Sequence, residues 1–546
     1  MSQADPEPAT AAAGARPPDG FAEALRRHLE ASLGRPVRCI ETHISWVLLD
    51  GEHAWKLKKP VRLGFLDFGS AEVRERFCHE ELRLNRRLAP GLYLDVVPIR
   101  GSRDRPRIDG GGPPVDHAVR MRQFPAGALL DERLASGRLE PEQVDRLARR
   151  IADFHAAAPV AGPATEFGSA ATIEAATSRV LDALAGAAPD PRIAPLRAWC
   201  EAEALRLRPE FGRRKAQGKV RECHGDLHLA NAVVLGDDDV TAFDCIEFDP
   251  ALRWIDLQSE VAFLVMDLLA HGRADLGFRF LDTWLESSGD HEGVTVLRYY
   301  LVYRALVRAM VAAIRAGQAA RRGPGGAAGP GVPPETGGPR ETGAPAGAPD
   351  YLSLAERLSR SRDPRLLITH GLSGSGKSHA ARLLLGPAGA IRLRSDVERK
   401  RLFGLRALEP SAPRVPGGIY REQDTERTYA RLLELAGVAL DAGWPVIVDA
   451  AFLRAGERAA FRRAAQARGV PFAILRCNAD PELLRARVAA RGREGDDPSE
   501  ADLSVLEGQL RGREPLQADE LPFAIEVDSA GEIDPRALAE AWRARS

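Results

Sequence analysis

The stretch "RLLITHGLSGSGKSHAARLLL", residues 365–385, constrains the fold of this chain more than any other. It places the pattern G-x-x-x-x-G-K-S between a short apolar run and a run with helical character. A loop of this type, between a strand and a helix, binds phosphate through successive backbone N–H groups and the helix N-terminus. The residues expected to hold the phosphates are Gly371, Ser373, Gly374, Ser375, Gly376, Lys377 and Ser378.

Four further apolar runs follow this loop. They lie within residues 390–396, 444–453, 471–479 and 523–529, and helical patterns separate them. Strands that alternate with helices favour a parallel sheet with helices on both faces. Two aspartates stand where strands are expected to end, Asp396 after the first of these runs and Asp449 in the second.

This second part of the chain resembles the small P-loop kinases that phosphorylate hydroxyl groups, such as shikimate and gluconate kinases, chloramphenicol phosphotransferase and zeta toxins. The resemblance implies that Asp396 contacts or deprotonates the acceptor hydroxyl and that Arg394 binds substrate. It also places Asp449 at the Walker B position, which orients magnesium together with Ser378. Arg491 or Arg493, in an arginine-bearing segment before a polar loop, matches the lid arginines that stabilise the moving phosphoryl group.

A second motif, "CHGDLHLANAVV", lies at residues 223–234. It places Asp226 five residues before Asn231, and Asp244 follows thirteen residues later on a predicted hairpin. Phosphoryl transfer needs a base that orients the acceptor and oxygen ligands that hold magnesium. The catalytic loop of kinases supplies an Asp and an Asn at the same interval, with a second Asp on the next hairpin.

With Gly225 in place of arginine, "HGDLHLAN" resembles the aminoglycoside phosphotransferase and choline kinase branch of the kinase-like fold. The resemblance implies that Asp226 is the base, that Asn231 and Asp244 hold magnesium, and that His224 stabilises the loop.

The kinase resemblance also requires a strand lysine in an N-terminal lobe. The segment "ISWVLLDGEHAWKLKKPV", residues 44–61, reads as a hairpin with a turn at Asp50-Gly51. Lys56 matches the lysine that holds the α- and β-phosphates, although Lys58 lies on the same face. Glu81 or Glu80, in the helical segment that follows, matches its ion-pair partner. Together the two parts resemble a family of predicted kinases that join an aminoglycoside phosphotransferase-like domain to a C-terminal P-loop ATP-binding domain.

Two other functions compete with this interpretation. His224, Asp226 and His228 form an H-x-D-x-H cluster, which also occurs in metal hydrolases, although such sites need further histidines and the chain has twelve in all. A nucleotide-regulated sensor, in which one ATP site is not catalytic, is the second alternative. It would bind ATP with little turnover of any small molecule.

Composition defines the domains and limits the partners. Residues 317–350 are rich in Gly, Pro and Ala and read as a flexible linker. We therefore predict a disordered tail over residues 1–20, a kinase-like domain over 21–316 and a P-loop kinase domain over 351–546. The net charge of −1 and the interrupted apolar runs give no reason to expect nucleic acid or a membrane as partner. Six scattered cysteines, the absence of a signal peptide and the composition fit a cytoplasmic protein.

The sequence thus predicts an α/β multidomain chain. An α+β, two-lobed, protein-kinase-like domain precedes a P-loop NTPase domain of the small-kinase type. The expected activity is transfer of the γ-phosphoryl group of ATP, with Mg²⁺, to a hydroxyl group of a small molecule, at two candidate sites.

Overall fold

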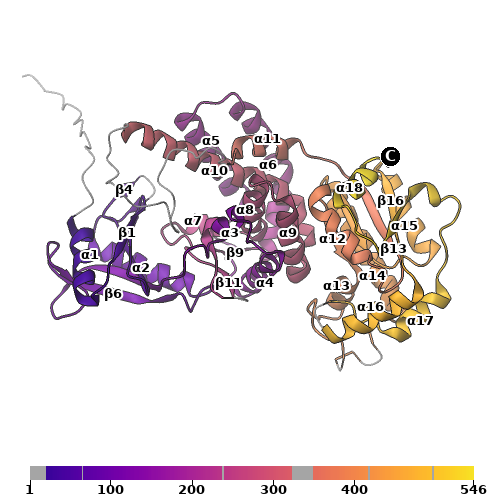
Figure 1. Cartoon of the computed structure of the whole chain (residues 1–546). Helices are drawn as coiled ribbons and strands as arrows, with labels where there is room; N and C mark the ends of the chain where they lie inside the picture. Colours follow the sequence, from indigo (N-terminus) through magenta and orange to yellow (C-terminus); the bar gives the residue numbers. More distant parts are fainter. Residues whose placement is uncertain are drawn as a thin grey trace, which may run out of the picture. The chain divides into compact units, whose positions relative to one another are not determined.

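The computed structural model describes residues 20–63, 66–236, 239–322, 349–412, 414–415, 418–494 and 497–545 (Figure 1). The chain forms two compact units. Unit 1 holds residues up to Ala126 together with Ile246–Asp249, and unit 2 holds Gly127–Cys245 and Pro250–Ser546. Most of the predicted tail and linker lies outside the described residues. The predicted domain boundaries stay a prediction, and the compact units divide the chain at a different place.

Unit 1 is built on a six-stranded sheet with the order β1-β2-β3-β8-β6-β7, whose paired strands are all antiparallel. The predicted hairpin is present, because β2 pairs with β3 and Gly51 has a φ of +95° in the turn between them. Apolar side chains of α1 and of the sheet form the core, including Phe21, Leu25, Trp46 and Trp55. The elements are α1 (Gly20–Leu33), β1 (Arg38–Glu41), β2 (Ser45–Leu49), β3 (His53–Lys58), β4 (Arg62–Leu63), β5 (Leu66–Asp67), α2 (Ala71–Asn85), β6 (Tyr93–Gly101), β7 (Pro106–Arg107) and β8 (Pro114–Arg122).

The first part of unit 2 is mainly helical, with two short two-stranded sheets, β10-β11 and β12-β9. Its longest helix, α10, packs against α5, α8 and α11. The elements are α3 (Leu130–Ala135), α4 (Pro141–Ala157), α5 (Ala170–Ala187), α6 (Ile193–Ala216), β9 (Val220–Glu222), η1 (Leu229–Asn231), β10 (Ala232–Val234), β11 (Val240–Ala242), α7 (Pro250–Arg253), β12 (Trp254–Asp256), α8 (Leu257–Ala270), α9 (Ala274–Ser288), η2 (His291–Gly293), α10 (Val294–Arg322) and α11 (Tyr351–Arg360).

Helix α11 packs against helices that precede the P-loop domain to which the sequence assigned it. It begins at the predicted start of the P-loop domain, yet it packs on α10, α6 and α8. Its buried side chains include Tyr351, Leu352 and Leu354, and the Tyr351 hydroxyl donates to Asp267 on α8 at 2.7 Å. Helix α11 is amphipathic and has ten residues. It buries its apolar face against the helices of the first part of unit 2.

The second part of unit 2 is a five-stranded parallel sheet with the order β14-β15-β13-β16-β17. Helices α12 and α18 cover one face, through a core that includes Leu367, Leu384, Leu475 and Trp542. The alternate strand residues point to the other face, where α14 and α15 contact the strands. The elements are β13 (Leu366–His370), α12 (Lys377–Ala388), β14 (Ile391–Arg394), α13 (Ser395–Leu402), α14 (Glu422–Asp441), β15 (Val446–Asp449), α15 (Ala455–Ala467), β16 (Phe472–Asn478), α16 (Pro481–Glu494), α17 (Leu503–Gly512), η3 (Leu521–Phe523), β17 (Ala524–Asp528) and α18 (Pro535–Arg543).

The predicted alternation of strands and helices is therefore found in this region. Across the described residues, no helix is both long enough and apolar enough to cross a membrane.

Candidate functional site

The phosphate-binding loop connects β13 to α12, and its glycines are there for steric reasons. Gly374 and Gly376 have φ values of +81° and +79°, a conformation that other residues adopt only with strain. A Cβ on Gly374 would lie 2.9 Å from the carbonyl oxygen of Leu484, and one on Gly371 would lie 2.7 Å from that of Cys477. The loop thus fits closely against β16 and α16, and its fold depends on these glycines.

The loop serine meets the predicted Walker B aspartate. Ser378 Oγ donates to Asp449 Oδ1 at 3.0 Å. Asp449 is the last residue of β15, and its Oδ2 is buried and makes no hydrogen bond. A serine hydroxyl beside a carboxylate is a donor set that suits Mg²⁺. Lys377, the first residue of α12, places its Nζ 3.4 Å from the carbonyl oxygen of Leu372 in the same loop.

Arg394 is the last residue of β14, so the strand ends two residues before Asp396, where it was expected to end. Asp396 falls in the first turn of α13, and the Tyr420 hydroxyl donates to its Oδ1 at 3.1 Å. Arg394 is buried, and its guanidinium nitrogens lie 3.5 Å from Asp449 and 3.4 Å from Asp497. The structure therefore brings Arg394 and Asp449 together, with Asp396 two residues from Arg394.

The two arginines predicted for the lid cannot be placed at the phosphate loop. Arg491 and Arg493 belong to α16, but their side chains lie outside the part of the chain that is described. Arg487, one turn before Arg491, donates to the carbonyl oxygen of Gly374 in the phosphate loop at 3.3 Å and to Ser529 Oγ at 2.9 Å. Arg487 was not among the expected lid residues, although it lies in the same arginine-bearing segment of the sequence.

The loop at residues 224–231 brings Asp226 and Asn231 together. Asn231 Nδ2 donates to the Asp226 carboxylate at 3.1 Å and to its carbonyl oxygen at 3.0 Å. The Asp226 side chain is 36% exposed. Burial alone would raise the pKa of Asp226, but His228 beside it and Arg308 hold that pKa below its ordinary value. The carboxylate is therefore ionised at neutral pH, as a group that orients a hydroxyl must be.

Asp244 lies beyond the strand on which it was predicted. Strand β11 ends at Ala242, and the N–H of Phe243, the residue before Asp244, donates to the carbonyl oxygen of Asn231 at 3.0 Å. Asp244 has a φ of +66°, a strained conformation for a residue other than glycine, and such strain clusters at functional sites. The strand stops because the backbone turns at this residue.

The loop is held by a buried carboxylate on α8. The two oxygens of Glu260 accept the N–H groups of His224 and Gly225 at 2.6 and 3.0 Å. Gly225 has a φ of +91°, and a Cβ there would lie 2.8 Å from the carbonyl oxygen of Leu252. The glycine of the H-G-D motif is therefore required by the backbone itself.

We expect Gly225→Ala to destabilise this loop. The positive φ costs on the order of 1 kcal/mol or more for alanine, and the contact with Leu252 adds to it. Amide hydrogen exchange of residues 223–231 should accelerate. Gly236→Ala is the matched control, because a Cβ at Gly236 meets nothing within 4 Å. Equal protection in Gly225→Ala and wild type would contradict this account.

The H-x-D-x-H cluster does not have free metal ligands on His224. Its Nε2 lies 2.7 Å from the carbonyl oxygen of Phe243, and its Nδ1 accepts the N–H of Asp226 at 3.3 Å. Both ring nitrogens are thus engaged with backbone groups. This geometry favours the role expected for His224, which is to stabilise the loop, over a hydrolase centre.

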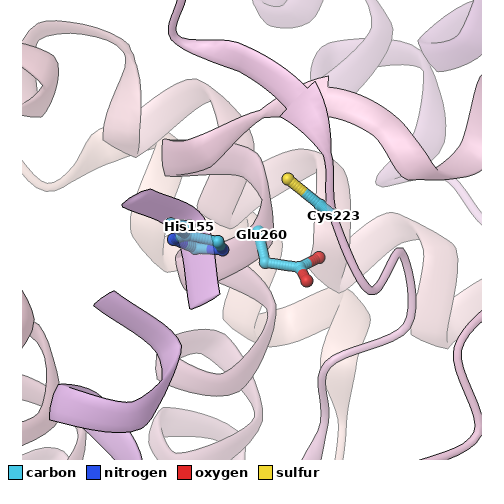
Figure 2. Close-up of side chains that lie close together, drawn as sticks. All are labelled: His155, Cys223 and Glu260. Atoms are coloured by element: carbon cyan, nitrogen blue, oxygen red, sulfur yellow. The ribbon is translucent and has the colours of Figure 1, made fainter. Parts of the chain in front are cut away.

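Three other side chains near this loop have the composition of a metal site. His155, Cys223 and Glu260 are all buried, with one potential ligand atom each within 4.8 Å of the others (Figure 2). Nδ1 of His155 accepts the indole N–H of Trp284 at 3.1 Å. Burial, and then Arg221, lower the pKa of His155 to about 3, so the ring is neutral and its single proton is on Nε2. Since Glu260 also binds two backbone N–H groups, this cluster supports the loop and does not suit a metal.

In unit 1, both candidate lysines contact Glu81. Lys56 lies 2.8 Å from Glu81 Oε1 and Lys58 lies 2.7 Å from Oε2. Lys58 is 1% exposed and is also bound by Glu247, whereas Lys56 is 14% exposed. Glu80 instead pairs with Arg83 on the exposed side of α2. The geometry thus favours Glu81 over Glu80, and Lys56 over Lys58 for contact with a ligand.

Comparisons with known proteins bear on the second part of the chain. A family model described as an AAA domain matches residues 366–516. An uncharacterized protein of Mycobacterium bovis and one of Mycobacterium tuberculosis strain H37Rv are each 29% identical over 461 residues, which is 84% of this chain and 86% of each relative. None of the comparisons supports an aminoglycoside phosphotransferase-like first domain, which stays a prediction.

Solved structures of small kinases are also similar. A sugar kinase from Janibacter sp. HTCC2649 is 22% identical, with a TM-score of 0.26, and covers 33% of this chain and 94% of its own. A gluconokinase from Sinorhizobium meliloti 1021 is 23% identical, with a TM-score of 0.24, and covers 34% of this chain and 90% of its own. The family match, together with the loop between β13 and α12, identifies residues 366–516 as a P-loop kinase-like domain.

Proposed function

We propose that the P-loop domain transfers the γ-phosphoryl group of ATP to a hydroxyl group of a small molecule. The contact between Ser378 and Asp449 carries this proposal, because it sets a hydroxyl and a carboxylate side by side at the start of α12. The loop N–H groups and Lys377 would bind the phosphates, and Ser378 and Asp449 would hold Mg²⁺. When bound, the cation neutralises charge on the phosphate oxygens.

Asp396 is the proposed base for this reaction. The acceptor oxygen forms the new bond to the γ-phosphorus, the bond from that phosphorus to the bridging oxygen breaks, and ADP leaves with the electron pair. The acceptor proton passes to the Asp396 carboxylate, which the Tyr420 hydroxyl orients at 3.1 Å. Arg394 would bind a polar group of the acceptor, and Arg487, which contacts the loop at Gly374, would stabilise charge on the phosphates. The lid role of Arg491 stays a prediction.

We infer a second phosphotransfer site at the loop of residues 224–231. Asp226 would orient and deprotonate an acceptor, and Asn231 and Asp244 would hold a second Mg²⁺. The hydrogen bond from Asn231 to Asp226 and the strained backbone of Asp244 support this inference. Within unit 1, the kinase resemblance implies that Lys56, paired with Glu81 at 2.8 Å, holds the α- and β-phosphates of a nucleotide.

The test measures ATP consumption by the full chain against a panel of sugars, amino alcohols and aminoglycosides, with mass spectrometry to detect a phosphorylated product. Removing a general base lowers turnover by about 10²- to 10⁴-fold, so Asp396→Asn and Asp226→Asn should each slow one reaction by that factor. Asp441→Asn is the control, because the Asp441 carboxylate is exposed and pairs with Arg468. Full turnover in both active-site variants would refute the proposal. Nucleotide binding without turnover of any acceptor would favour a sensor.

A further inference from the structure

Helix α9 carries two carboxylates that face the P-loop fold. Asp282 and Glu286 lie four residues apart and therefore share one face of the helix. The helix packs against α12 and β14, within unit 2. Although α9 precedes the P-loop motif by about 90 residues, it forms part of the surroundings of that motif.

Both carboxylates bind an arginine inside the P-loop fold. Arg392 lies on β14 and is fully buried. It donates to the two oxygens of Asp282 at 3.1 and 2.6 Å and to Glu286 at 3.1 Å. Such bidentate, charge-assisted contacts have strict geometry. The position of the Arg392 guanidinium is therefore set by α9.

The same guanidinium group also lies close to Ser378 and Asp449, the residues proposed to hold the cation. Arg392 Nη1 donates to the carbonyl oxygen of Ser378 at 3.4 Å and lies 3.6 Å from Asp449 Oδ2. Arg394 repeats the arrangement, since its nitrogens lie 3.6 Å from Glu286 and 3.5 Å from Asp449. Glu286 and Asp449 thus share both arginines, and Asp282 shares Arg392 with them.

Because Arg392 contacts both the α9 carboxylates and Asp449, the α9 carboxylates affect the charge balance around Asp449. A buried arginine needs a carboxylate partner. Without the α9 carboxylates, the acidic group left beside Arg392 would be Asp449. An ion pair between Arg392 and Asp449 would compete with a divalent cation for the carboxylate. Neutralising Arg392 from α9 leaves Asp449 available to the cation.

We propose that Asp282 and Glu286 are positioning residues of the P-loop site, which keep Arg392 and Arg394 from drawing Asp449 away from Mg²⁺. The proposal rests on the function proposed above for that site. It makes the helical part of the chain a necessary component of cation binding by the P-loop domain.

The test follows the Mg²⁺ dependence of nucleotide binding to the full chain, with a non-hydrolysable ATP analogue and isothermal titration calorimetry. We expect Asp282→Asn to raise the Mg²⁺ concentration required for half-maximal binding by about 10-fold or more, as changes beside a metal ligand do. Asp275→Asn is the matched control, because Asp275 is on the same helix but is exposed and pairs with Arg273. Thermal unfolding of each variant reports whether it is folded.

A double variant distinguishes whether Asp282 positions Arg392 or only attaches α9 to the P-loop domain. Asp282→Asn combined with Arg392→Met removes the uncompensated cation, so the Mg²⁺ dependence should return to within about threefold of wild type. If α9 only attaches the domain, the double variant will bind at least as poorly as Asp282→Asn alone, and the inference is wrong. Unchanged Mg²⁺ dependence in Asp282→Asn would also overturn it, while leaving the proposed function intact. If wild type does not bind the analogue, the proposed function itself fails.

Discussion

Lys377→Ala is expected to lower phosphotransfer at the P-loop site by about 10²- to 10³-fold, the loss typical when one pre-positioned donor to a developing charge is removed. Lys377 begins α12, where the backbone already favours anions. Among the described residues, its Nζ hydrogen-bonds only to the carbonyl oxygen of Leu372, at 3.4 Å, so the ammonium group can turn to a phosphate at small cost. Product formation from ATP, quantified by mass spectrometry, measures the loss.

Two further variants define what Lys377 contributes. Lys377→Arg keeps the charge and changes the geometry, so it should retain more nucleotide binding than turnover. Lys215→Ala removes a lysine that contacts the carbonyl oxygen of Thr165 in the helical part, and it should leave the reaction unchanged. Wild-type turnover in Lys377→Ala would show that the reaction is not catalysed at this loop.

The fold of the P-loop domain could be predicted from sequence because its signals are local. The motif fixes the order of strand, loop and helix, and each later strand is a short apolar run between helical patterns. The β-hairpin of unit 1 could also be predicted, because the Asp50-Gly51 dipeptide is typical of the turn between two antiparallel strands. These features depend on neighbours in the chain, which the sequence displays directly.

The details of the sites depend on contacts between distant residues. Lys56 and Lys58 could not be distinguished, because they share a strand face and what separates them is Glu247, 189 residues after Lys58. Similarly, Arg392 was not identified, because its partner Asp282 lies 110 residues earlier. No pattern of spacing reveals such pairs.

The motif at residues 224–231 could be predicted in part, because some of its contacts are local in sequence and others are not. Its spacing indicated the side chains that meet, and Asn231 does contact Asp226. The length of the strand before Asp244 was overestimated, because an apolar run shows where a strand can form and not where the backbone turns. Glu260, which holds the loop, gave no signal within the apolar sequence of α8.

Arg214→Ala is expected to cost about 3–5 kcal/mol of local stability, the usual loss when one partner of a buried ion pair is removed. Arg214 is 1% exposed at its side chain and binds two buried carboxylates, Asp256 at 2.7 Å and Asp290 at 2.7 Å. Asp256 also caps α8 through the N–H of Gln258, and α8 carries Glu260. Gly293 leaves the space that the guanidinium occupies, since a Cβ there would lie 2.5 Å from it.

Amide hydrogen exchange across α6 and α8 measures this loss, because it reports the free energy of local opening. Arg206→Ala is the matched control on α6, where Arg206 forms an exposed pair with Glu203 worth at most about 1 kcal/mol. Arg214→Lys keeps a charge but loses the planar fork, so its protection should fall between those of wild type and Arg214→Ala. Wild-type protection in Arg214→Ala would contradict the ion-pair account.

The pH dependence gives an independent check on Arg214. Burial alone would raise the pKa of Asp290, but Arg214 lowers that pKa to about 2. A lowered pKa stabilises the fold above the unfolded value of about 3.9, and this contribution is lost as the pH falls towards 2. In Arg214→Ala, Lys219 remains 3.1 Å from Asp290 while the guanidinium is lost, so the pKa of Asp290 lies nearer its unfolded value and less stability is lost as the pH falls. The stability difference between the two proteins should therefore narrow below about pH 4, whereas a defect caused by lost packing alone would stay constant with pH.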